Sequence, residues 1–173
     1  MEILLIVEGK EDKEFLKFYT QKLKLGYKIE EVGGNKNFDL VREKIEEYNH
    51  HRVAIIFDCD DNFEESFNNI IKEKFNEVKI FLFPNNQDCG NLETILEKIV
   101  RHQNIIQCFN SFIECINRLG YEPPDSKRKL FSYKEILQCN PKEMKAEDFE
   151  KCFDIEHKFL EPLKDFLLGL KNE

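Results

Sequence analysis

The sequence predicts an α/β fold, in which helices cover both faces of a parallel sheet and a helical extension follows towards the carboxyl end. The first observation is a set of short, continuous apolar runs, such as 3–7 and 53–57. Runs of this kind are typical of strands that are buried on both faces. The second observation is that the runs alternate with segments of helical period, which favours parallel pairing. The third is that both runs stop abruptly at carboxylates.

Four strands and three connecting helices are expected before the extension. Apolar residues at spacings of three and four define each helix, as Phe38, Val41 and Ile45 do in the second one. The first helix carries Glu11 and Asp12 in its first turn, where the helix dipole favours acids. We expect the strand order 2-1-3-4, which brings the first and third strands side by side. The expected strands are 3–7, 27–32, 53–57 and 78–83, and the expected helices are 11–25, 37–49 and 62–75.

The rest of the chain is predicted to be helical. From Leu92 to Leu119 the apolar residues continue at helical period, which fits one long helix or two joined helices. Further helices are expected at 129–137 and 155–170. We therefore expect one compact domain overall, with an α/β core at 1–107 and a helical extension at 108–173 that packs on it.

The composition fits a compact domain with a buried core. The chain has 173 residues, of which 41% are hydrophobic and 12% aromatic, enough for one well-buried core. No stretch approaches the roughly 20 apolar residues that span a bilayer, and no signal peptide is recognised, so we expect a cytoplasmic protein without a membrane partner. The formal net charge of −8 disfavours strong, autonomous binding of nucleic acid without excluding it, because such binding depends on Lys and Arg that neutralise phosphates.

Six cysteines are scattered along the chain without a Cys-x-x-Cys pair. Several of them fall at apolar positions of predicted helices, so we expect reduced thiols in the core. A structural zinc site is not expected from this spacing. The six are Cys59, Cys89, Cys108, Cys115, Cys139 and Cys152.

Carboxylates follow the first and third predicted strands. Because ligands of open parallel sheets bind beyond the carboxyl ends of the strands, Glu8 should emerge there beside Asp58 and Asp60. Crowded carboxylates repel one another unless a cation or protons neutralise them. Mg²⁺ is a hard cation that takes oxygen ligands. The sequence therefore predicts an acidic metal site, with Mg²⁺ or Mn²⁺ as the cofactor.

The residues around this site also carry a family resemblance. The stretches Val7–Asp12 (VEGKED) and Asp58–Asp60 (DCD) resemble the two signatures of the Toprim domain, which occurs in topoisomerases, bacterial primases and OLD-type nucleases. The resemblance covers 1–107, with the two motifs in the expected order. It implies a Toprim-like Rossmannoid fold with three α/β/α layers. As a whole, the chain resembles small stand-alone Toprim proteins of uncharacterised function that are similar to OLD nucleases.

The resemblance also implies roles for particular residues. Asp58 and Asp60 would hold one or two Mg²⁺ ions, and Glu8 would be a further ligand or the general base. Lys10 would neutralise charge in the transition state. Asp61, in the same acidic turn, is a further candidate.

Glu93 is the last acidic candidate of the site. It belongs to a Gly-x-x-Glu segment after the fourth strand, and some small Toprim-related proteins have a comparable segment. The alternative is that Glu93 only complements the dipole of the helix that it begins.

Three loops could border the site or bind phosphate. Gly33-Gly34 follows the second strand and is either an ordinary tight turn or a loop that contacts phosphate. The polar loop 84–90 follows the fourth strand and could lie at the same sheet edge. Lys127–Lys129 is the compact basic cluster of the chain and is either a solvated turn or a phosphate-binding patch.

Of the reactions that the resemblance implies, hydrolysis by water is the one that fits this chain. Topoisomerases also need a nucleophilic tyrosine on a separate domain, and no tyrosine of this chain lies in such a context. In OLD-type nucleases the Toprim domain is usually fused to an ATPase. Because this chain has no Gly-rich Walker loop, an ATPase partner would be a separate chain.

We therefore predict Mg²⁺-dependent hydrolysis of phosphodiester bonds in nucleic acid, while the sequence leaves open whether the chain is an active enzyme. The alternative is a catalytically weak module that binds metal or nucleotide and acts as a regulatory subunit, which the net acidity favours. A third interpretation makes Asp58–Asp61 an acidic turn of an ordinary doubly wound fold, similar to receiver domains or small phosphatases.

Overall fold

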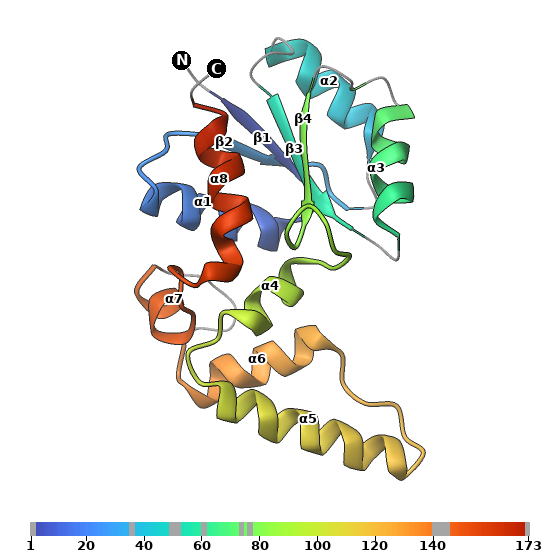
Figure 1. Cartoon of the computed structure of the whole chain (residues 1–173), viewed down its shortest axis with the longest axis vertical. Coiled ribbons are helices and arrows are strands. Elements are labelled where there is room, and N and C mark those ends of the chain that lie inside the picture. The colour runs from blue at the N-terminus through green and yellow to red at the C-terminus, as the bar shows by residue number, and fades with distance from the viewer. Residues whose placement is uncertain are drawn as a thin grey trace. The chain divides into compact units, whose positions relative to one another are not determined.

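The computed structural model describes residues 3–34, 37–48, 53–59, 62–72, 75, 78–139 and 146–171 (Figure 1). The strands are β1 (Leu4–Val7), β2 (Lys28–Glu31), β3 (Val53–Asp58) and β4 (Lys79–Phe83). The first helices are α1 (Lys10–Lys22), α2 (Phe38–Tyr48), α3 (Phe63–Lys72) and α4 (Leu92–Lys98). They are followed by α5 (Gln103–Arg118), α6 (Ser126–Ile136), α7 (Ala146–Cys152), the 3-10 helix η2 (Lys158–Leu160) and α8 (Glu161–Gly169).

The chain groups into two compact units by its internal contacts. The sheet unit is Met1–Leu92 together with Lys158–Glu173, and the helical unit is Glu93–His157. The last helix, α8, therefore belongs with the sheet. This grouping differs from the expected one, which assigned everything after residue 107 to one extension.

The sheet unit contains a four-stranded parallel sheet in the order β2-β1-β3-β4. The predicted α/β class, parallel pairing and strand order are therefore confirmed. In the middle of the sheet, every side chain of Leu4–Val7 is fully buried, which explains the continuous apolar run of β1. At one edge, Lys28 and Glu30 of β2 are only partly buried, which explains why the apolar pattern of β2 is interrupted.

Helices cover both faces of this sheet (Figure 1). On one face, Ile55 of β3 shares a core cluster with Ile45 of α2 and Ile70 of α3. On the other face, the ring of Phe81 in β4 lies 5.1 Å from the ring of Phe166 in α8, measured between centroids. Helix α1 covers this second face too (Figure 1). The sheet unit is thus built as helix, sheet and helix layers, and the carboxyl ends of its strands share one edge.

The helical unit has its own buried centre. Tyr133 of α6 is fully buried, and its hydroxyl donates to the carbonyl oxygen of Cys152 over 2.7 Å. Phe153 packs on Tyr133 with ring centroids 5.8 Å apart. A disulfide joins Cys139 to Cys152, with 6.8 Å between their Cα atoms. These contacts hold the segment around α7 to α6.

The helix boundaries of this unit correct several expectations. The apolar stretch after Leu92 forms two helices, α4 and α5, which is the second of the two expected alternatives. The next helix begins at Ser126, earlier than expected, because the Asp125 carboxylate caps it by accepting from the Arg128 N–H at 2.8 Å. Helix α7 was not expected at all.

The final helix also begins later than the expected residue 155. The Asp154 N–H donates to the Ile99 carbonyl oxygen at 2.7 Å, and Phe153 forms an isolated bridge with Val100. Their backbone groups are therefore used in a contact between distant segments, and helix starts only afterwards, at η2 and α8. Among the helices that the structure describes, none is long and apolar enough to cross a membrane.

Candidate functional site

Two of the predicted site residues lie at the carboxyl ends of neighbouring strands. Glu8 directly follows β1, and Asp58 is the last residue of β3. The two strands are neighbours in parallel, with Val7 paired to Ile56 in the register. Both side chains are half-buried, and one carboxylate oxygen of each, Glu8 Oε2 and Asp58 Oδ1, is shielded from solvent. The sequence thus correctly placed these two acids on adjacent strand ends.

The turn after Glu8 is fixed by a helix cap. Gly9 is the N-cap of α1, and its backbone N–H donates to Asp12 Oδ2 at 2.8 Å. A Cβ atom on residue 9 would lie 3.2 Å from the same oxygen, so glycine allows this close approach. Asp12 is buried. Its capping role was not predicted, although an acid three residues after an N-cap is the sequence signal for it.

The Gly33-Gly34 turn lies against the backbone of Glu8. Both glycines have positive φ, +81° and +80°, which side chains rarely adopt. The Val32 N–H donates to the Val7 carbonyl oxygen at 3.0 Å, and the Gly34 N–H donates to the Glu8 carbonyl oxygen at 2.9 Å. The turn therefore extends the pairing of β2 with β1 and holds the main chain at Glu8. Its role towards phosphate stays a prediction.

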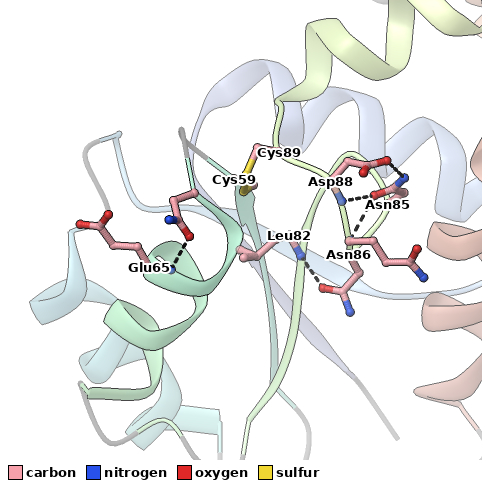
Figure 2. Close-up of a disulfide and its surroundings, with 9 residues drawn as sticks. Cys59, Glu65, Leu82, Asn85, Asn86, Asp88 and Cys89 are labelled. Carbon is pink, nitrogen blue, oxygen red and sulfur yellow. Dashed lines mark hydrogen bonds between the residues drawn. A yellow bond between two sulfur atoms is a disulfide. The ribbon is translucent and has the colours of Figure 1, made fainter.

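The loop 84–90 lies against the end of β3, as Figure 2 shows. Cys59, which follows Asp58, is joined to Cys89 by a disulfide, with 4.7 Å between their Cα atoms. Two backbone hydrogen bonds of 2.9 Å each also connect Cys59 with Gly90 in both directions. The expectation that this loop borders the acidic edge is therefore met. Cys59 and Cys89, like Cys139 and Cys152, lie within disulfide distance of each other, which differs from the expected unpaired core thiols, while Cys108 and Cys115 are free but exposed.

The loop also has a rigid internal structure. Asn85 Oδ1 accepts from the backbone N–H groups of Gln87 and Asp88, at 3.1 and 2.8 Å. Asn86 Oδ1 accepts from the Leu82 N–H at 3.0 Å, and these amides and Asp88 are visible in Figure 2. The side chains of the loop therefore hold the loop itself in shape.

Of the remaining candidates near these strand ends, the structure describes Lys10 but not Asp60 and Asp61. The Lys10 side chain is 78% exposed, and its Nζ lies 3.8 Å from Glu14 Oε1 on the same helix. Asp60 and Asp61 lie outside the residues that the structure describes. Within the described ranges, no group of three or more His, Cys, Asp or Glu side chains fits a metal ion. The predicted set of Glu8, Asp58 and Asp60 therefore remains a prediction.

A family model described as a protein of unknown function matches residues 2–172. The chain belongs to the DUF3226 family. No curated protein and no solved structure gives a significant match. The DUF3226 match carries no Toprim assignment, so the Toprim resemblance stays a hypothesis about this chain.

Glu93 of the DUF3226 chain lies in the helical unit and has a basic neighbour there. Its Oε1 is 4.0 Å from Lys127 Nζ. One turn further along α4, Glu97 Oε2 is 2.6 Å from Nζ of Lys129, which also lies 3.3 Å from Asn110 Oδ1. Two lysines of the Lys127–Lys129 cluster thus face carboxylates. This arrangement favours a structural role for Glu93 and for the cluster.

A polar network on the edge strand β2 was not predicted. Glu30 lies between two lysines: Lys28 Nζ is 2.6 Å from Glu30 Oε1, and Lys44 is hydrogen-bonded to Glu30 Oε2. Lys28 also donates to the Tyr48 hydroxyl. The hydrogen bonds from Lys28 and Lys44 hold the pKa of Glu30 below its usual value of 4.5. The network covers the edge of the sheet with paired charges.

Three tyrosines of the DUF3226 chain have a raised pKa in this structure. Burial raises the pKa of Tyr19 to about 12 and raises the pKa of Tyr27 and Tyr133. The hydroxyl of Tyr27 donates to the Leu167 carbonyl oxygen and that of Tyr133 to Cys152, each at 2.7 Å. The hydroxyls of Tyr27 and Tyr133 are therefore engaged as hydrogen-bond donors.

Proposed function

We propose that this DUF3226 chain hydrolyses phosphodiester bonds of nucleic acid with Mg²⁺ or Mn²⁺, as a Toprim-type, OLD-like nuclease. The observation that carries the proposal is the position of Glu8 and Asp58 at the ends of neighbouring parallel strands. Ligands of open parallel sheets bind at this edge. One oxygen of each carboxylate is shielded from solvent, so a bound cation would act in a partly dry environment.

The donor set fits Mg²⁺ in chemical type. Mg²⁺ takes oxygen ligands and keeps several waters, so one or two carboxylates and a substrate phosphate are enough to bind it. Glu8 and Asp58 supply two carboxylates, and we assign Asp60 as the next. When bound, the ion would polarise the phosphoryl group and lower the pKa of an attacking water.

The protein's own groups are assigned as follows. Asp58 binds the metal, and Glu8 either binds the metal or takes the proton of the attacking water. The main chain on either side of Glu8 is held by the Gly9 cap and by the Gly34 N–H, so the Glu8 side chain starts from a fixed point. Lys10 remains the proposed partner for negative charge in the transition state. To reach a substrate phosphate, its exposed side chain would have to break its ion pair with Glu14.

A separate ATPase chain is part of this proposal, because the Toprim domain of OLD-type nucleases is usually fused to an ATPase and this chain has no Gly-rich Walker loop. The formal net charge is −8, and Lys127 and Lys129 each lie against a carboxylate. Strong autonomous binding of a duplex needs several unpaired Lys or Arg residues. The same observation supports the second candidate, a regulatory module that binds metal or nucleotide without cleaving nucleic acid.

A cytoplasmic location is also proposed, and the cysteines provide its test. Reducing systems of the cytosol keep most protein thiols reduced, whereas exported proteins keep disulfides. Rapid alkylation of thiols during cell lysis, followed by mass spectrometry, should find Cys59 and Cys89 modified as thiols. Complete protection of both cysteines in freshly lysed cells would contradict the cytoplasmic assignment.

Metal binding is the first test of the function. Asp58→Asn should abolish calorimetrically detected Mn²⁺ binding, because the amide loses the negative charge that attracts the ion. Asp39→Asn is the matched control, since the Asp39 side chain is 96% exposed and lies on α2. Equal Mn²⁺ binding by Asp58→Asn and the parent would remove the metal site from the proposal.

Cleavage is the second test and separates the two candidate functions. Glu8→Gln keeps the size of the side chain but cannot take a proton, so cleavage of plasmid DNA or RNA should fall by roughly 10²-fold or more while some Mn²⁺ binding remains. Glu11→Gln, an exposed acid on α1, is the control. Unchanged activity in Glu8→Gln would refute its role. Mn²⁺ binding by a parent that cleaves no nucleic acid, alone or with a co-encoded ATPase, would favour the regulatory module.

A further inference from the structure

Helix α5 carries two apolar stripes, and one of them is more buried than the other. This first stripe has one buried and three half-buried residues: Ile106, Phe109, Ile113 and Ile116. The second stripe is shifted around the helix by about one residue, and we name it the α5 stripe. It consists of Ile105, Cys108, Phe112, Cys115 and Leu119.

Most of the α5 stripe is exposed. Phe112 is 49% and Leu119 is 64% exposed, and Cys108 and Cys115 are exposed and free. Among the residues that the structure describes, the exposed large hydrophobic side chains all lie between 112 and 136. These side chains are Phe112, Leu119, Tyr121, Phe131 and Ile136. Exposed apolar surface that is concentrated in one region marks a site of protein contact.

The spacing of the α5 stripe is that of a coiled-coil seam. Its residues alternate in steps of three and four, with the large side chains at the a positions of a heptad and the cysteines at the d positions. In an antiparallel pair of such helices, an a residue of one helix packs beside a d residue of the other. Two of the three large side chains of one copy then meet the two small cysteines of the other, which fills these layers evenly.

A parallel pair would fit less well. It would set Phe112 against Phe112 and cysteine against cysteine, so that crowded layers would alternate with loose ones. Overpacked and underpacked layers both reduce stability. The pattern of side-chain sizes therefore favours the antiparallel orientation.

The charge of α5 suits a second copy of the same acidic chain. The formal net charge of −8 makes two copies repel each other over most of their surface. Helix α5 carries one acid and one base, Glu114 and Arg118, and these lie 3.5 Å apart on the same helix. The helix is therefore neutral, and two copies can approach along it without opposing like charges.

We propose that two copies of this chain pair through their α5 stripes in antiparallel orientation, about a two-fold axis. Such an interface is isologous, so that each copy presents the same surface to the other. Pairing would cover Phe112 near its centre and would shield Cys108 and Cys115 from solvent. The proposal does not depend on the metal-dependent function.

Sedimentation across a wide range of protein concentration tests the pairing. The parent should form a dimer, and Phe112→Glu should raise its dissociation constant by about 30-fold or more, as expected for a central anchor residue. Gln107→Glu introduces the same charge on the polar side of α5 and should leave the dimer unchanged. Circular dichroism should show equal helix content in all three proteins. Leu119→Glu provides a second stripe variant if Phe112→Glu folds poorly.

Thiol chemistry gives a measurement on the parent without substitution. The reaction of Cys108 and Cys115 with a maleimide should slow as the protein concentration rises and the dimer forms. A parent that stays monomeric, or that pairs only with a different protein, would overturn the proposal. So would a dimer that Phe112→Glu leaves intact, and efficient oxidative Cys108–Cys108 cross-linking would overturn the antiparallel orientation.

Discussion

The central strands and helix α5 are both rich in apolar residues, yet they use them differently. In β1 and β3, the side chains of Leu4–Val7 and Val53–Phe57 are almost completely buried between helices on both faces. In α5, by contrast, Ile106 is buried while Phe112 remains half exposed. Apolar surface that the chain covers with its own residues stabilises the fold. Apolar surface that it leaves exposed is available to a partner. Burial, rather than composition, therefore separates the folding surface from the contact surface.

Deleting the same aromatic ring from each region should give the largest contrast. Phe81→Ala removes a ring that is packed between Phe83 and Phe166, and it should lower the free energy of unfolding by about 3–5 kcal/mol. Phe112→Ala should cost under about 1 kcal/mol in dilute monomer, because the site is solvated already. Urea unfolding of both variants measures the two values. Equal losses would show that α5 belongs to the folding core and would end the distinction.

The disulfides should have a smaller effect, and one bond lies in each unit. In the chain-entropy model, Cys139→Ala should lower the free energy of unfolding by about 3 kcal/mol. Cys89→Ala opens the longer loop and should lower it by about 0.7 kcal/mol more. The loops span 30 residues for Cys59–Cys89 and 13 for Cys139–Cys152. Thermal or urea unfolding without reductant measures the losses. Added reductant should lower the stability of the parent, because its disulfides open, and should thereby remove most of the difference from both variants. Identical stability of parent and variants without reductant would mean that the bonds do not form in solution.

The network at the edge strand β2 should contribute least and should depend on pH. Because the pKa of Glu30 is lowered in the folded state, its contribution is present above the unfolded value near 4.5 and is lost as pH falls below it. Glu30→Gln should therefore destabilise the sheet unit slightly at pH 7, by under about 1 kcal/mol because the site is solvated. The difference from the parent should disappear in acid. Glu46→Gln, exposed on α2, serves as the control, and a difference that persists unchanged in acid would contradict the assignment.

The strands of the sheet were predictable because their signal is local. An apolar run such as Leu4–Val7 has few alternatives to a strand buried on both faces. The strand order followed from the requirement that Glu8 and Asp58 converge, and the structure has that order. Edge strand β2 gave a weaker signal because Lys28 and Glu30 bond along the edge instead of packing into the core.

The missed features depend on contacts between distant residues. Spacing alone does not determine which cysteines pair, so the Cys59–Cys89 bond could not be derived from the sequence. Helix α7 is short and highly charged, and its buried Phe149 and Cys152 are too few to form a clear stripe. The lysine that faces Glu93, Lys127, lies far along the chain, and nothing around Glu93 signals it.

The position of α8 has a consequence for how the chain folds during synthesis. Helix α8 covers Phe81 in the sheet unit, yet its residues are synthesised after the whole helical unit, Glu93–His157. Until then, this face of the sheet lacks part of its cover and exposes aromatic side chains. Exposed apolar surface on a partly folded chain promotes aggregation. The sheet of a nascent chain therefore gains its full cover only after the helical unit has been made.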